Sequence, residues 1–109
     1  MATQKKTIEF ILHKLGHAPR FVARAMFGEY ALYADGKVVA LVCNDQLFVK
    51  IMPESATLEE VCEKAPPYPG AKPHYVIEKS MLSMYPELPE MLFAIASALP
   101  DKKQKKRSK

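Results

Sequence analysis

The chain has 109 residues, 49% of them hydrophobic, and a formal net charge of +4. This length suits one domain, and the longest apolar runs are too short to span a membrane. The polar N-terminal residues lack the apolar segment of a signal peptide, so the sequence predicts a cytoplasmic protein. Cys43 and Cys62 stand outside any Cys-x-x-Cys pattern and are expected to be reduced thiols.

The excess positive charge is concentrated at the C-terminal end. Without the six cations of the last eight residues, the chain carries ten cations against twelve anions, a net charge of −2. We therefore divide the chain into a domain at 1–101 and a basic, disordered tail at 102–109. The tail is expected either to serve only as a solubilising end or to bind nucleic-acid phosphates without reading sequence. Its cations are Lys102, Lys103, Lys105, Lys106, Arg107 and Lys109.

The first predicted element is a helix at Thr3–Leu15. Its apolar residues recur at helical spacing and form one stripe. Gly16 is expected to end the helix, and Pro19 prevents its continuation. The stripe consists of Ile8, Ile11, Leu12 and Leu15.

Three consecutive strands are predicted next, at Met26–Ala34, Lys37–Cys43 and Gln46–Ile51. Asp35-Gly36 and Asn44-Asp45 separate them, and both dipeptides favour two-residue hairpin turns. Two-residue turns fix the strand register.

In this register Tyr30 faces Leu41, and Leu41 faces Phe48. Both faces of the sheet are then apolar, whereas a sheet wet on one side alternates apolar and polar residues. Two helices can cover one face. The second face is expected to be covered by Pro73–Leu99 or by a partner, including a second copy in a two-fold dimer. Its interface candidates are Tyr30, Leu32, Val39, Leu41 and Phe48.

The remaining elements are predicted to be a short acidic helix at Glu54–Lys64, a proline-rich connector at Ala65–Pro73, a short strand at His74–Glu78 and a helix at Leu88–Leu99. The expected fold class is therefore α+β, with a small antiparallel meander flanked by an N-terminal and a C-terminal helix.

The strand region also carries a family signature. The run Arg24-x-Met26-Phe27-Gly28-Glu29-Tyr30, followed by Gly36-Lys37 and Leu47-x-Val49-Lys50, resembles the TfoX (Sxy) N-terminal domain of bacterial competence regulators. The resemblance implies a curved antiparallel sheet with flanking helices and a regulatory or interaction module. The family that this sequence resembles includes two-domain members, which regulate competence genes as co-activators alongside the cyclic-AMP receptor protein. This chain has no room for their C-terminal domain and is expected to be a single-domain member.

The motif residues Arg24, Met26, Phe27, Gly28 and Tyr30 have two interpretations. In the structural one, Gly28 marks a bulge or close backbone approach, Met26 and Phe27 fill opposite faces, and Arg24 pairs with an acid such as Glu29. In the functional one, Arg24 marks a contact surface.

No catalytic or metal-binding constellation is evident in the sequence. His13 and His17 have the spacing of helical metal ligands, but Gly16 is expected to end the helix between them, and no third ligand is apparent. The serines and cysteines have no partner base in a recognisable motif. We therefore predict neither an enzyme nor a cofactor.

Two functions remain open. The first is a protein-interaction module of the transcription-regulator type, with the transcription machinery or a regulator as partner. The second is a small ligand-binding protein or enzyme with a pocket near Arg24 and Tyr30. A concave polar pocket beside the sheet favours the second, and a flat or filled surface favours the first.

Overall fold

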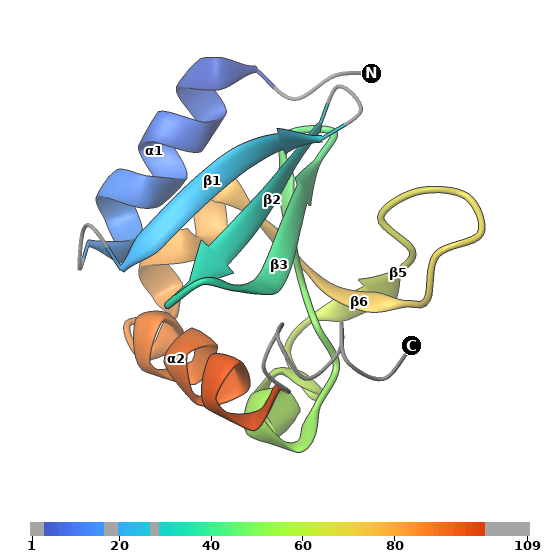
Figure 1. The fold of residues 1–109 in the computed structure, drawn as a ribbon. Helices are drawn as coiled ribbons and strands as arrows, with labels where there is room; N and C mark the ends of the chain where they lie inside the picture. Colours follow the sequence, from blue (N-terminus) through green and yellow to red (C-terminus); the bar gives the residue numbers. More distant parts are fainter. Residues whose placement is uncertain (1–3, 17–19, 27–28, 100–109) are drawn as a thin grey trace, which may run out of the picture.

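A six-stranded antiparallel sheet with strand order β1-β2-β3-β4-β6-β5 organises the fold (Figure 1). The computed structural model describes residues 4–16, 20–26 and 29–99. In this region no helix is both long and apolar enough to cross a membrane. The elements are α1 (Lys5–Leu15), β1 (Phe21–Met26), β2 (Glu29–Ala34), β3 (Lys37–Cys43), β4 (Gln46–Val49), the 3₁₀ helix η1 (Pro53–Leu58), β5 (Glu63–Ala65), β6 (His74–Glu78), the 3₁₀ helix η2 (Lys79–Met84) and α2 (Leu88–Ala98).

The predicted α+β class, the two flanking helices and the three-strand meander are confirmed. Asp35, Gly36, Asn44 and Asp45 all have positive φ, as type I′ hairpin turns require. Gly16 ends α1 with φ 67°. The sheet is larger than the predicted meander, because Phe21–Met26 forms an additional edge strand before it, and His74–Glu78 and Glu63–Ala65 join beyond β4.

The prediction of an acidic helix at Glu54–Lys64 is wrong. Only Pro53–Leu58 is helical, with 3₁₀ geometry, and Glu63–Ala65 instead pairs with β6. The Ser55 hydroxyl stabilises the 3₁₀ turn, because it donates to the carbonyl of Lys50 at 2.7 Å and accepts the N–H of Met52 at 3.0 Å. The apolar stripe expected of the helix does not form, since Val61 is 60% exposed.

A β-bulge in β3 corrects the predicted register. Tyr33 pairs with Val38 and Leu32 pairs with Ala40, which leaves Val39 as an extra residue. Tyr30 consequently faces Val42 instead of Leu41. A one-residue insertion moves every later side chain of a strand to the opposite face. The predicted pairing of Leu41 with Phe48 beyond the second turn is confirmed.

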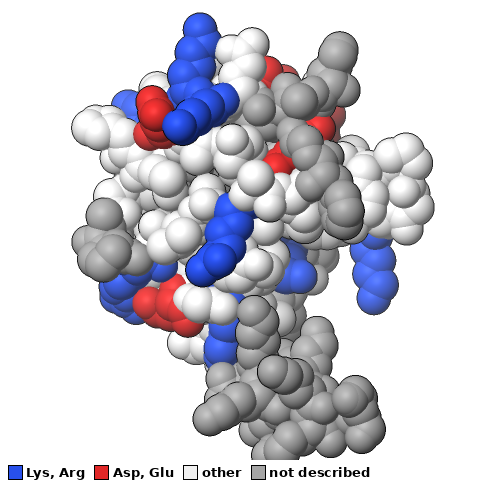
Figure 2. All heavy atoms as spheres, turned by 45° about the horizontal axis from the view of Figure 1, so that its top comes forward, with Lys and Arg blue, Asp and Glu red and all other residues white. Residues whose placement is uncertain are grey.

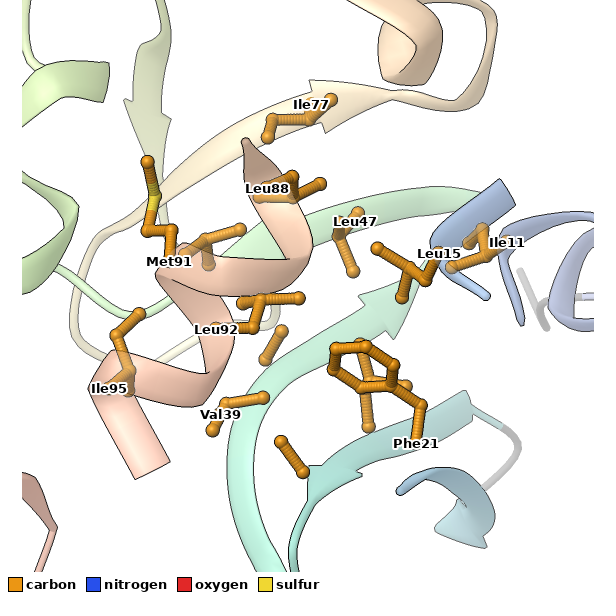
Figure 3. Packing of buried hydrophobic residues seen from close by; sticks show 14 of the residues in the cluster. Ile11, Leu15, Phe21, Val39, Leu47, Ile77, Leu88, Met91, Leu92 and Ile95 are labelled. Atoms are coloured by element: carbon orange, nitrogen blue, oxygen red, sulfur yellow. The ribbon is translucent and has the colours of Figure 1, made fainter. Parts of the chain in front are cut away.

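The hydrophobic core lies between the two helices and one face of the sheet (Figure 3). Ile11 and Leu15 approach from α1, and Leu92 and Ile95 approach from α2. The strands contribute side chains that alternate along each strand, as one face of a sheet requires, except at the bulge, where Val39 and Ala40 are consecutive. These side chains are Phe21, Leu32, Ala34, Val39, Ala40, Val42, Leu47, Val49, Tyr75 and Ile77.

Two polar contacts fix the helices to the sheet. Asp45, in the β3–β4 turn, accepts the backbone N–H of Gln4 at 3.0 Å and the hydroxyl of Thr7 at 2.8 Å, so the turn caps the start of α1. Lys37 donates its Nζ to the carbonyls of Ala96 and Leu99 at the end of α2. The last carbonyls of a helix lack the usual partner one turn further on, and the lysine supplements the N–H of Leu99, which lies 3.3 Å from the Ala96 carbonyl.

Candidate functional site

The sheet has an inner face toward the helices and an outer face on the opposite side. Strand pairing places the outer-face residues in rows, because directly paired residues of antiparallel strands point to the same side. One row crosses all six strands and begins and ends with a charged residue. In the order of the strands it consists of Arg24, Ala31, Leu41, Phe48, Val76 and Glu63.

The outer face is apolar and partly accessible. Ala31, Cys43 and Phe48 are buried, although they do not belong to the core cluster of the inner face. Around them, Val22 is 40% exposed. The half-buried neighbours are Tyr33, Val38, Leu41 and Val76. The prediction that both faces of the sheet are apolar is therefore confirmed.

The five interface candidates do not share one face. Tyr30, Leu32 and Val39 lie on the inner face, where Leu32 and Val39 are buried and Tyr30 packs against the core. Leu41 and Phe48 lie on the outer face. The bulge at Val39 causes this division, because it reverses the facing of the residues that follow it in β3.

The motif residues are also divided between the faces. Arg24 is exposed on the outer face, and its guanidinium carbon lies 5.6 Å from the centre of the Tyr33 ring. The carboxylate of Glu29 accepts the N–H of Asn44 at 3.1 Å. Met26 is half-buried at the end of β1. Phe27 and Gly28, which are predicted to fill one face and to mark a bulge, lie outside the described residues.

Arg24 and Tyr30 lie on opposite faces of the sheet. Arg24 pairs with Ala31, and Tyr30 pairs with Ala25, so adjacent pairs place the two side chains on opposite sides. Three cavities that are lined by described residues alone include neither Arg24 nor Tyr30 in their lining.

One of these cavities is a hollow of about 260 Å³ at the β5–β6 edge of the sheet, with lining residues from both sheet faces. Two exposed carboxylates, Glu63 and Glu78, stand beside the amide of Gln46. Apolar and aromatic side chains complete the lining, namely Val61, Cys62, Val76, Ile77, Met81 and Tyr85. We call this cavity the acidic hollow. The sequence does not reveal the acidic hollow, because the apolar pattern of 54–64 predicts a helix for Glu63, and a long connector separates Glu63 from Glu78.

Both cysteines are free, as expected, and they differ in environment. Cys43 is buried in β3, and burial, with the Glu29 carboxylate adding to it, raises the pKa of its thiol to about 11. Cys62 is half-buried and donates its thiol to the Tyr85 hydroxyl at 3.6 Å.

Thiol labelling should therefore distinguish the two cysteines. At pH 8 a thiol of pKa about 11 is about 0.1% thiolate, so a disulfide reagent should label Cys62 in the native protein and Cys43 only after unfolding. Cys62→Ser should abolish native labelling, whereas Cys43→Ser should leave it unchanged. Rapid native labelling of the Cys62→Ser variant would contradict this assignment.

The histidines do not assemble a metal centre in the described part of the chain, where no three His, Cys, Asp or Glu side chains form a ligand group. His13 is exposed on α1, and His17 lies outside the described residues. The Nδ1 of His74 lies 2.9 Å from the carbonyl of Lys72, and burial lowers the pKa of this histidine.

Charges on the surface are dispersed. In the view of Figure 2, lysine and arginine side chains lie at several separate places among uncharged residues. Arg20 donates two hydrogen bonds to the carboxylate of Asp35, and its guanidinium carbon lies 3.7 Å from the centre of the Phe93 ring. The Nζ of Lys64 lies 2.8 Å from a carboxylate oxygen of Glu59. The six cations proposed for nucleic-acid contact, in 102–109, lie outside the described residues.

Fold and site together define a small α+β domain in which helices cover one sheet face and an apolar second face remains partly accessible. The chain belongs to the TfoX N-terminal domain family, whose pattern matches residues 13–99. It is also 35% identical over 106 residues to a protein of Spirochaeta aurantia described as an uncharacterized 12.7 kDa protein in the trpE 5′ region. That match covers 97% of this chain and 91% of the relative.

Proposed function

We propose that this domain is a non-enzymatic interaction module that regulates transcription through protein contacts on the outer face of its sheet. The apolar outer face carries this proposal. Val22, Tyr33, Val38 and Leu41 form accessible apolar area beside Arg24. Accessible apolar patches with a charged margin are typical of protein contact surfaces. The resemblance to competence regulators supplies the transcriptional context, since those proteins carry the same domain.

The outer face provides contact area and offers little for catalysis. Its central residues are aliphatic or aromatic, and Cys43 at its floor has a raised pKa that keeps the thiol protonated. Tyr33 and Arg24 are amphipathic side chains of the kind that anchor protein interfaces. A partner that covers this face would bury apolar area at about 25 cal/mol per Å².

Replacement of Leu41 by Glu in the native host tests the proposal. We expect the Leu41→Glu allele to change the same transcripts as deletion of the gene, because a carboxylate in the centre of the contact area disfavours burial. RNA sequencing of the wild type, the deletion strain and the variant strain measures this effect.

Two further variants control for folding. Val22→Glu places the same charge at a 40% exposed outer-face position, where the cost to the fold is small, and should reproduce the effect. Met84→Glu places it in η2 at a 67% exposed position outside the outer face and should behave as wild type. A deletion strain with unchanged transcripts would refute the regulatory role. Outer-face variants that match the wild type while the deletion differs would refute the assignment of the surface.

A further inference from the structure

We infer that the acidic hollow binds the chain's own basic C-terminal tail. The inference is independent of the proposed function. Three observations carry it: the distribution of charge, the length of the tail with its point of departure, and the lining of the hollow.

Charge differs in sign between the C-terminal half of the domain and the tail. Residues 51–99 hold seven acidic side chains and three lysines, whereas residues 102–109 hold six cations and no acid. Glu59 already binds Lys64 and the Tyr75 hydroxyl. Glu63 and Glu78 remain exposed, and no ion pair of either is described. These two carboxylates therefore complement the tail.

The start of the tail is fixed by α2. Lys37 Nζ holds the carbonyl of Leu99, the last described residue, at 2.9 Å. From Lys37 to Cys43 along β3 is about 20 Å, and two strand spacings to Glu78 add about 10 Å sideways. The direct separation is thus about 22 Å.

A fully extended chain covers about 3.3 Å per residue. Lys102 and Lys103 therefore reach at most about 13 Å from Leu99, short of the hollow. Lys105 reaches about 20 Å, which is also short of this separation, whereas residues 106–109 reach about 23–33 Å and span it. The most distal cations are therefore assigned to the hollow, namely Lys106, Arg107 and Lys109.

The lining of the hollow suits a lysine or arginine side chain. Val76, Met81 and Tyr85 provide apolar and aromatic surface for the methylene stem, while Glu63 and Glu78 face the cationic head. The Gln46 amide adds a hydrogen-bond acceptor. Arg24 and its positive charge lie at the opposite edge, four strand spacings or about 19 Å from β6.

NMR of the full chain provides the test. Amide shifts of the full chain are compared with those of a chain that ends at Asp101, in 20 mM and 500 mM salt. The expected differences cluster at Gln46, 61–63 and 76–78, and they shrink at high salt because exposed charges are screened. They should not depend on protein concentration, since the contact is within one chain.

Matched variants distinguish this contact from general attraction. The double variant Glu63→Gln and Glu78→Gln should remove the shift differences. The double variant Glu9→Gln and Glu60→Gln removes the same charge elsewhere and should retain them. Replacing Lys106, Arg107 and Lys109 by Gln should mimic truncation, whereas replacing Lys102, Lys103 and Lys105 should not.

Other outcomes would overturn the inference. Shift differences confined to residues 95–101 would mean that the tail binds no site. Differences clustered at 54–60 would place the tail at another site, and differences that grow with protein concentration would indicate binding to a second copy. A gel-shift assay with a nonspecific duplex adds a second measurement. Freed from the hollow, the tail of the Glu63→Gln and Glu78→Gln variant should bind DNA two- to fivefold more tightly than that of the Glu9→Gln and Glu60→Gln variant. Equal affinities would contradict competition for the tail. None of these results depends on the transcript changes that test the proposed function.

Discussion

Leu92→Ala should lower the free energy of unfolding by about 2–5 kcal/mol, the largest effect expected of any single truncation considered for this domain. Leu92 is 0% exposed and lies at the centre of α2, between the helix and the strands that carry Val39 and Leu47. The substitution removes buried methyl groups and leaves a cavity that neighbours from several elements cannot close. Urea unfolding followed by circular dichroism measures the change.

The appropriate control is Met84→Ala. Met84 is also a large apolar residue near the C-terminal half of the fold, but it is 67% exposed in η2. Its truncation should change the free energy of unfolding by less than about 0.5 kcal/mol. Equal losses for the two variants would show that α2 does not pack on the inner face as described.

Asp45→Ala should cost about 2 kcal/mol through two separate effects. The carboxylate caps α1 from the β3–β4 turn, accepting the N–H of Gln4 and the hydroxyl of Thr7, which is 1% exposed. Loss of a cap costs about 1 kcal/mol. Asp45 also has φ 62°, a left-handed conformation that alanine adopts at a further cost.

Asp45→Asn separates the cap from the charge. Asparagine keeps a side-chain oxygen acceptor and tolerates positive φ, so this variant should remain within about 0.5 kcal/mol of the wild type. Thermal and urea unfolding of both variants should agree. If Asn destabilised the domain as much as Ala, the negative charge would be the important feature instead of the acceptor.

The hairpins and the outer helices could be predicted from local sequence. Asp35-Gly36 and Asn44-Asp45 determine their turns because few residues adopt positive φ, and this preference acts within four residues. The apolar stripes of α1 and α2 likewise follow from spacing along one segment. Glycine at position 16 stops α1 for the same local reason.

Segments with weak local preferences were decided by contacts distant in sequence. The 54–64 segment has a helical apolar pattern, but an isolated helix of that length is marginal. Glu63–Ala65 instead pairs with β6, a contact between segments that are distant in sequence. Phe21–Met26 became a strand because β2 offered an edge, and its residues alternate too little in polarity to show it in advance.

The sequence by itself determined the α+β class, the two type I′ turns, the meander order and the presence of apolar residues on both sheet faces. Tertiary structure alone decided which residue lies on which face. A single bulge at Val39 exchanged the facing of Leu41 relative to Tyr30 and Leu32. Pairing of β5 with β6 brought Glu63 and Glu78, which are distant across the proline-rich connector, to one hollow. The physical reason is that side chains alternate with a period of two, so one added residue that no local preference announces reverses every position after it.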